Sequence, residues 1–190
     1  MKKTVLFLTI CALTLATVPA VAQSTWFGAQ GSAVLPTGDL KEVTTSGGGG
    51  VVHLDQAISK SFQVRVDAGW LQFSSRERGE DLSTKARVIP VRAGLDWMFG
   101  PYDGTRFYVG GMAGAYFREF SATVGDEKSS DNDTFFGAAV TAGMLIPISA
   151  HGGQLEINAS YDLWFDDKDA AGNELDMGLV RLGVGYRFNI

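Results

Sequence analysis

The first candidates for chemistry are ionisable side chains that stand at alternate positions within short apolar stretches. Ten residues share this placement: His53, Asp55, Arg65, Asp67, Arg92, Asp96, Glu156, Asp162, Arg181 and Arg187. A histidine beside a carboxylate can act as a general base, and two converging carboxylates can catalyse hydrolysis. Opposite charges on facing strands can instead neutralise one another inside a closed structure.

The neutralising interpretation fits these residues better than the catalytic one. The sequence has two histidines, and neither has a serine placed beside it to complete a nucleophile–base pair. His151 adjoins Gly152 and Gly153 in a predicted turn, whereas His53 falls on the polar face of a stretch where Asp67 is its expected neighbour. Because every acid on the polar faces has a candidate arginine, we expect an interior charge network and no enzymatic activity.

Strands are the elements that must position these residues, because the apolar residues repeat with a period of two. The last stretch shows this most simply, with Val180, Leu182, Val184 and Tyr186 alternating with polar residues and glycines. Eight such segments are predicted, at residues 26–35, 50–57, 62–73, 86–99, 107–118, 136–146, 155–165 and 178–190. Pro90 cannot donate a ladder hydrogen bond, so a bulge or a late strand start is expected there.

The breaks between segments are alternately long and short, the first of them long. Transmembrane barrels have short periplasmic turns and long outer loops, and in bacteria an even number of strands. The pattern predicts an all-β fold, an eight-stranded antiparallel up-and-down transmembrane β-barrel. A soluble lipocalin-like barrel or a sandwich would share the period of two. Aromatic residues near both ends of the apolar faces favour the membrane barrel.

The end of the chain resembles the C-terminal signal that the outer-membrane assembly machinery reads. The residues that carry the resemblance are Gly185, Tyr186, Phe188 and Ile190, although Gly183 stands where the signal has a polar residue and Ile190 where it prefers phenylalanine. With this signal and the eight segments, residues 23–190 resemble small bacterial outer-membrane β-barrels of the OmpA/OmpX type. The resemblance implies assembly machinery, outer-membrane lipid and lipopolysaccharide as partners, and a monomer.

The front of the chain predicts export. Lys2 and Lys3 precede an apolar run, and Ala20-Val21-Ala22 ends it, so residues 1–22 are expected to be a signal peptide. A membrane anchor is the less favoured alternative, because the run is short for a span of about 20 residues. Without Lys2 and Lys3 the 16 basic side chains fall to 14 against 21 acidic ones, a balance that argues against nucleic acid as a partner. The predicted domain is 23–190, located in the bacterial outer membrane.

Opposite charges also predict how the strands align. Antiparallel registers that pair Asp55 with Arg65 and His53 with Asp67 are expected between the second and third strands. Arg65 is expected opposite Asp96 across the third and fourth strands. Between the seventh and eighth strands, the same reasoning pairs Glu156 with Arg187 and Asp162 with Arg181.

The resulting expectation is a non-enzymatic outer-membrane protein with a structural, adhesive or surface-interaction role and an interior closed by paired charges. A narrow pore for small solutes is the alternative. A lipid A-modifying enzyme is a more distant alternative, which is considered because some similar barrels are enzymes that use histidine with serine and a carboxylate. No cofactor or metal is expected. The acidic loop at 166–174 lacks the spacing of a calcium site and is interpreted as a solvated outer loop.

Overall fold

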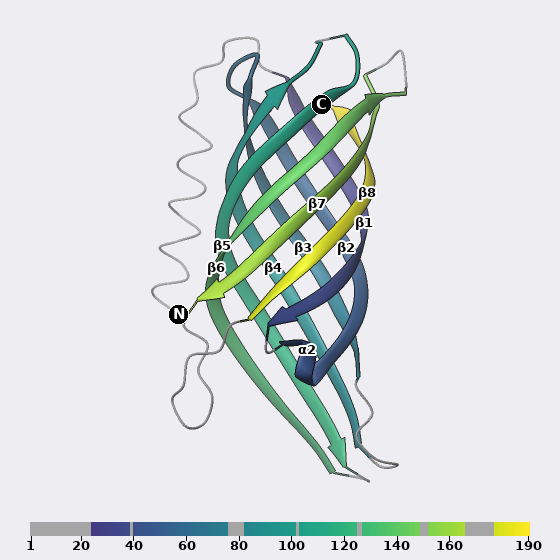
Figure 1. Ribbon diagram of the computed structural model, residues 1–190, viewed down its shortest axis with the longest axis vertical. Helices are drawn as coiled ribbons and strands as arrows, with labels where there is room; N and C mark the ends of the chain where they lie inside the picture. Colours follow the sequence, from purple (N-terminus) through teal and green to yellow (C-terminus); the bar gives the residue numbers. More distant parts are fainter. Residues whose placement is uncertain are drawn as a thin grey trace.

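The computed structural model describes residues 24–38, 40–75, 82–101, 103–124, 127–148, 152–165 and 177–190. Within them, eight strands form one closed antiparallel barrel in which chain neighbours pair and the last strand pairs with the first (Figure 1). The elements are β1 (Thr25–Gly38), α2 (Leu40–Val43), β2 (Thr44–Ala57), β3 (Phe62–Ser75), β4 (Leu82–Phe99), β5 (Arg106–Val124), β6 (Glu127–Pro147), β7 (Gln154–Phe165) and β8 (Met177–Asn189). The predicted eight-stranded up-and-down barrel is confirmed. The predicted signal peptide, His151 and the loop 166–174 lie outside the described residues.

The period of two places apolar side chains on the outer wall and ionisable ones inside. On β3, Phe62 and Trp70 are about half exposed, whereas Arg65 and Asp67, between them, are buried. On β8, Leu182 and Val184 are exposed and Arg181 is buried. This inside-out distribution of polarity is the opposite of that in a soluble barrel, whose charged face meets water.

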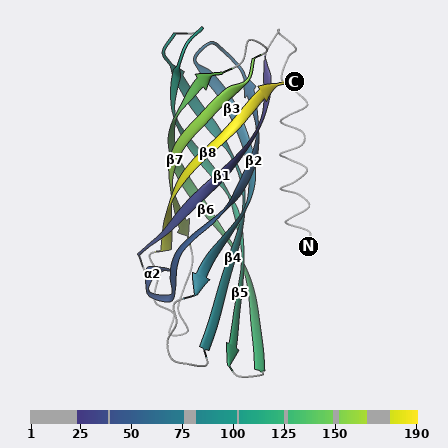
Figure 2. The ribbon, with the colours of Figure 1, turned by 90° about the vertical axis from the view of Figure 1, so that its right-hand side faces the viewer.

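The strands are longer than predicted at the end of the barrel where α2 lies. There β5 and β6 continue past the rest, pairing from Glu119 and Asn132 out to Val124 and Glu127, and β4 accompanies them from Leu82 (Figure 2). The prediction of a long loop between the fifth and sixth strands is therefore wrong, because residues 119–124 and 127–134 continue the ladder as paired strand segments. We call residues 82–85, 119–124 and 127–134 the β4–β6 extension.

Pro90 produces neither the bulge nor the late strand start that was expected. The β3–β4 register is the same on both sides, with Ala68 opposite Val91 and Leu71 opposite Val88, and only the intervening pairs are missing. On its other side Pro90 pairs with Tyr116 of β5. The missing amide hydrogen thus interrupts pairing on one side without changing the alignment.

The connections at the opposite end of the barrel are short turns. In the β2–β3 turn the amide of Ile58 donates to the Phe62 carbonyl oxygen at 3.0 Å. Gly100 and Gly152 have φ values of 105° and 87°, a region that suits glycine, and they lie in the other two short connections. We call the end of the barrel that carries these three turns the short-turn end, and the opposite end the long-loop end.

Among the described residues, no helix combines the length and the apolar character that a membrane span requires.

Candidate functional site

The ten ionisable residues all lie inside the barrel, and none is more than 3% exposed. They gather in two groups at different depths. The Arg65 cluster, nearer the short-turn end, consists of His53, Asp55, Arg65, Asp96, Glu156 and Arg187. The Arg92 cluster, nearer the middle, consists of Asp67, Arg92, Asp162 and Arg181.

Arg65 is the centre of its cluster, because its guanidinium meets three carboxylates. Nε lies 2.9 Å from Asp55 Oδ1 and 3.1 Å from Asp96 Oδ2, and Nη1 lies 2.9 Å from Glu156 Oε1. The same Glu156 oxygen accepts a hydrogen bond from the Tyr108 hydroxyl. These contacts join β2, β3, β4, β5 and β7, so the cluster ties strands together across the lumen.

His53 lies between two carboxylates of this cluster. Nδ1 is 3.1 Å from Asp55 Oδ2 and Nε2 is 3.0 Å from Glu156 Oε2. Both oxygens can accept when ionised, so both contacts are electrostatically favourable when the two ring nitrogens carry hydrogen. A side chain at Gly28 would collide with this ring, so glycine is needed there. With His53 charged, three cations balance the three acids of the cluster.

The Arg92 cluster is smaller and equally balanced. Arg92 forms a two-pronged contact with Asp67, Nε to Oδ1 at 2.9 Å and Nη2 to Oδ2 at 2.5 Å, and its Nη1 reaches Asp162 on the other side of the barrel at 2.7 Å. Arg181 lies 4.0 Å from Asp67 and donates through Nε to Ser160 at 3.1 Å. Fork-shaped contacts of this kind are among the stronger charge-assisted hydrogen bonds.

Toward the long-loop end the interior becomes apolar, which the sequence analysis did not foresee. The aromatic plug, as we call it, comprises Val34, Leu40, Val51, Leu71, Phe73, Ala86, Val88, Tyr116, Phe135, Trp164, Met177 and Leu179. The Phe135 and Trp164 rings are 4.7 Å apart, and Tyr116 packs beside both. Consecutive apolar residues such as Val34-Leu35 and Val88-Ile89 were the available signal, since apolar neighbours in a strand face opposite sides.

The contacts correct several predicted pairings. The Asp55–Arg65 pair forms as expected, but Glu156 lies opposite Gly185 and Asp162 opposite Leu179, so the register of β7 with β8 differs from the predicted one by two residues. Arg187 instead reaches Asp55 at 2.8 Å, across β1. The prediction assumed that charges pair along adjacent strands, whereas long arginine side chains here pair across the lumen.

Two further predicted charge pairings also differ from the observed contacts. Arg65 lies opposite Gly94 rather than Asp96, and meets Asp96 diagonally. His53 does lie opposite Asp67 in the ladder, but Asp67 bonds Arg92, and the imidazole faces other carboxylates. The candidate acids all have an arginine partner.

A family model described as "Outer membrane protein beta-barrel domain" matches residues 8–188. The chain belongs to this outer-membrane β-barrel family. Among curated protein sequences, none matches.

Several solved structures share the fold of this chain. Neisserial surface protein A is 16% identical with a TM-score of 0.62, and the match covers 90% of this chain and 100% of that protein. Ail, the attachment invasion locus protein of Yersinia pestis, is 19% identical with a TM-score of 0.56, covering 87% and 97%. A major outer membrane protein of Thermus thermophilus is 11% identical with a TM-score of 0.62, covering 87% and 99%.

Family membership identifies the apolar outer wall as the surface that meets lipid. Exposed aromatic residues lie near both ends of it. Those toward the short-turn end are Phe62, Trp97, Phe99, Phe107, Tyr186 and Phe188, and those toward the long-loop end are Trp70, Phe136 and Phe165. Such girdles flank the apolar band of outer-membrane barrels.

The residues of the predicted assembly signal lie at the short-turn end of β8. Tyr186 and Phe188 face outward, Gly185 faces the interior, and Ile190 follows the strand and donates its amide to the Thr25 carbonyl oxygen at 2.9 Å. Phe188 packs on Phe27 of β1, with ring centroids 5.6 Å apart. The signal's role in assembly stays a prediction.

Proposed function

We propose that this chain is a closed, non-enzymatic outer-membrane barrel that acts through its outer surface, in a structural, adhesive or surface-interaction role. The observation that carries the proposal is the filled interior: two charge-balanced clusters and the aromatic plug succeed one another along the barrel axis. An eight-stranded barrel is just wide enough for its interior to be filled by side chains. A continuous aqueous path for solutes therefore has no room.

The histidine geometry supports a non-enzymatic role. Both His53 nitrogens face carboxylates, and the side chain is 1% exposed, so a substrate has no access to the imidazole. A general base must come within hydrogen-bond reach of the proton that it removes. His53 is better suited to holding Asp55 and Glu156 together.

The β4–β6 extension is the surface through which we propose that the protein acts. It is polar in sequence and bears ion pairs at its base, Arg87–Glu119 at 3.1 Å and Arg118–Asp133 at 2.9 Å. Two similar proteins carry the names of a surface protein and of an attachment invasion locus protein, which fits such a role. In this proposal residues 1–22 are removed on export, and the barrel resides as a monomer among outer-membrane lipid and lipopolysaccharide.

Conductance tests the closed interior. Purified barrel reconstituted into planar bilayers should give no steady unitary current, while unboiled and boiled samples should differ in electrophoretic mobility, which verifies folding. A large-pore porin in the same bilayers is the positive control. Steady unitary currents from folded protein would reject the closed barrel in favour of the narrow pore.

A shortened hairpin tests the surface role. Replacing residues 120–131 with Asn-Gly leaves Glu119 opposite Asn132 and closes the hairpin with a favoured two-residue turn. This variant should fold and insert like the wild type, yet cells that display it should lose adherence to fixed epithelial cells. A matched control exchanges the same twelve residues for a scrambled order of equal charge. If cells with the wild-type and shortened barrels adhere equally, the extension is not the acting surface.

We also propose that the assembly machinery reads the end of β8. Phe188→Ala and Ile190→Ala remove the two apolar anchors, and the double variant should accumulate outside the outer membrane. Phe99→Ala, a change on the same wall at the same end, is the matched control. Normal surface levels of the double variant would contradict this assignment.

A further inference from the structure

The β1–β8 seam, where the first and last strands pair, is the place at which the barrel closes. All other strand pairs join chain neighbours, so without this seam the strands would form an open sheet with β1 and β8 at its edges. Toward the short-turn end, residues 26–31 of β1 pair with residues 184–189 of β8. We call these residues the short-turn half of the seam.

Inside the barrel, few side chains meet directly across the short-turn half of the seam. The inward-facing pairs Gly28–Arg187 and Gln30–Gly185 each contain a glycine. A Cβ atom at Gly185 would lie 2.4 Å from the Ala29 carbonyl oxygen, so the close approach of the two backbones requires glycine there. Cross-strand side-chain pairs stabilise a ladder beyond its backbone hydrogen bonds. This half of the seam therefore needs other contacts to hold it.

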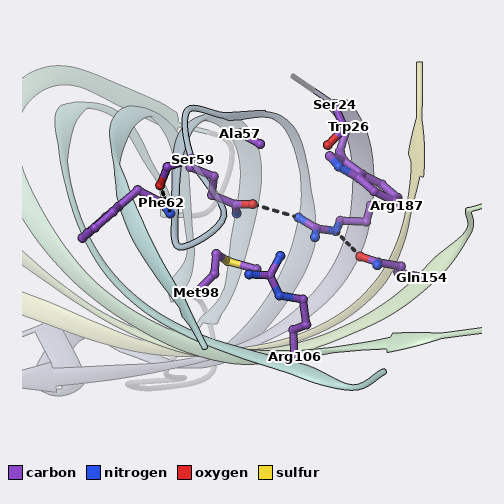
Figure 3. A pocket seen from close by; sticks show the side chains of 10 residues that line it. Ser24, Trp26, Ala57, Ser59, Phe62, Met98, Arg106, Gln154 and Arg187 are labelled. Carbon is purple, nitrogen blue, oxygen red and sulfur yellow. Dashed lines mark hydrogen bonds between the residues drawn. The ribbon is translucent and has the colours of Figure 1, made fainter. Parts of the chain in front are cut away.

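Arg187 supplies these contacts by reaching past β1 to the strands beyond it. Nη1 donates to Asp55 of β2 at 2.8 Å and to Gln63 of β3 at 3.3 Å. On the other side of the seam, Nε donates to Gln154 of β7 at 2.8 Å. The guanidinium carbon lies 4.8 Å from the centre of the Trp26 ring of β1 (Figure 3). One side chain of β8 therefore contacts β7, β1, β2 and β3.

The contacts of Arg187 with Asp55 and Gln63 require a closed seam. In the barrel, β8 and β2 lie on the two sides of β1, and Gly28 of β1, opposite Arg187, has no side chain to block the reach. In an open sheet, five strands would separate β2 from β8. At a spacing of about 4.8 Å per strand, that is roughly 29 Å, which no arginine side chain spans. These two contacts therefore report closure itself.

Arg187 also differs from the other interior arginines in lying beside an internal space. A cavity of about 170 Å³ lies at the short-turn end, and of the ten interior ionisable residues only Arg187 lines it (Figure 3). Since a water occupies about 30 Å³ in the liquid, the cavity has room for several waters. A guanidinium that leaves Asp55 can be hydrated there, while Asp55 keeps its contacts with Arg65 and His53. The contact can therefore break without stranding a buried charge.

We propose that Arg187 is the closing contact of the barrel: its bonds to Asp55 and Gln63 hold the short-turn half of the seam together, and this half opens before the rest of the barrel unfolds. A buried arginine that only added to general stability would strengthen every ladder alike. Arg187 instead sets the free energy of one local opening, the separation of β1 from β8. The inference is independent of the surface role proposed for the long-loop end.

Amide hydrogen exchange of the folded barrel in detergent micelles, followed residue by residue by NMR, tests the seam. In wild-type protein, amides of the short-turn half should exchange faster than those of the β4–β5 ladder at the same end, because local opening costs less free energy than global unfolding. That ladder is a matched reference, since its inward pair Asp96–Gly110 also contains a glycine. Arg187→Gln should raise the rates of the short-turn half at least ~10-fold, the factor expected from losing a charge-assisted hydrogen bond.

Arg92→Gln is the control for a general loss of stability. Arg92 binds Asp67 of β3 and Asp162 of β7, and these contacts remain when only the seam opens. The rates of the short-turn half should therefore stay within about twofold of wild type in Arg92→Gln. Equal increases in Arg187→Gln and Arg92→Gln would show that the seam opens only with the whole barrel, and would overturn the proposal. Unchanged rates in Arg187→Gln would overturn it as well.

A cross-link across the seam tests the local opening without a change at Arg187. Gly31 and Val184 lie opposite each other on the outer wall, and a side chain at Gly31 would meet open space. The sequence has one cysteine, Cys11 in the predicted signal peptide, so Gly31→Cys with Val184→Cys introduces one defined pair. Oxidation should slow exchange in the short-turn half at least ~10-fold, and reduction should restore it. Equal exchange in the oxidised and reduced forms would contradict local opening.

A milder variant keeps the test decisive if Arg187→Gln does not fold, which the mobility shift on boiling reveals. Gln154→Ala removes the acceptor that holds Nε of Arg187 and leaves the charges of the cluster in place. It should raise the exchange rates of the short-turn half about 3-fold or more, with the β4–β5 ladder unchanged. Wild-type rates in folded Gln154→Ala would count against Arg187 as the closing contact.

Discussion

The two halves of the barrel interior are filled by different means. Toward the short-turn end, ten buried ionisable side chains form two clusters whose charges balance. Toward the long-loop end, aliphatic and aromatic side chains pack against one another, with Leu40 of α2 among them. The same eight strands therefore enclose an ionic half and an apolar half, and each should respond to substitution in its own way.

The difference lies in what a single deletion leaves behind. In the apolar half, a smaller side chain leaves a cavity, whose cost depends on the volume lost. In the ionic half, removing one member leaves an opposite charge without a partner in a place that water does not reach. Matched removal of two opposite charges avoids that penalty, whereas removal of two apolar side chains enlarges the cavity. The sign of the coupling between two substitutions therefore separates the halves.

The largest effect is expected for Glu156→Gln in the ionic half. Glu156 contacts Arg65, His53 and Tyr108 and is fully buried, so its loss leaves an excess positive charge and should lower the free energy of unfolding by about 3–5 kcal/mol. Adding His53→Gln removes a positive charge and should restore part of the loss. Urea unfolding in lipid vesicles, followed by tryptophan fluorescence, measures both. Additive losses would show that the cluster is not coupled.

A somewhat smaller effect is expected for Leu71→Ala in the apolar half. Leu71 is fully buried in the aromatic plug, so truncation should lower the free energy of unfolding by about 2–4 kcal/mol through lost burial and the remaining cavity. Leu71→Met, which keeps the volume, should cost less than about 1.5 kcal/mol in the same urea titrations. If Met is as damaging as Ala, the plug depends on detailed shape rather than on volume.

The period of two was enough to predict the strands, their number and the side that each residue faces. That signal is local. Asp162 stands between Tyr161 and Leu163, whose side chains face outward, so the side chain of Asp162 must face the interior of the barrel. The ten interior residues were found for this reason. Their burial could be read from alternation without knowing which strands they would meet.

The pairings within the interior were not predictable in the same way. Arg187 was expected to meet Glu156 on the adjacent strand but bonds Asp55 two strands away, because a long side chain in a narrow lumen can reach several acids. A shift of two residues keeps every side chain on its face, so alternation does not choose between such registers. The aromatic plug was missed because Phe135 precedes the predicted segment 136–146, and because Trp164 shares its strand face with the polar residues Ser160 and Asp162.

The smallest effect on stability is expected for an ion pair on the outer surface of the barrel. Comparing it with the buried ion pairs shows how much burial alone contributes. Arg87 and Glu119 lie 3.1 Å apart on the outside of β4 and β5, each 46% exposed, and Arg87 also lies over the Trp70 ring. Water solvates both partners when the pair is broken, so Arg87→Gln should lower the free energy of unfolding by only about 0.2–1 kcal/mol. High salt should reduce even that, since exposed pairs are screened.

The matched measurement is the buried pair Arg92–Asp162, whose atoms lie 2.7 Å apart with both side chains fully buried. Arg92→Gln should cost about 3–5 kcal/mol, and its double-mutant cycle with Asp162→Asn should show a coupling that salt does not weaken. The cycle of Arg87→Gln with Glu119→Gln should show a coupling below about 1 kcal/mol. Equal couplings in the two cycles would mean that water reaches the Arg92 cluster, and the barrel would then be open enough to reconsider as a pore.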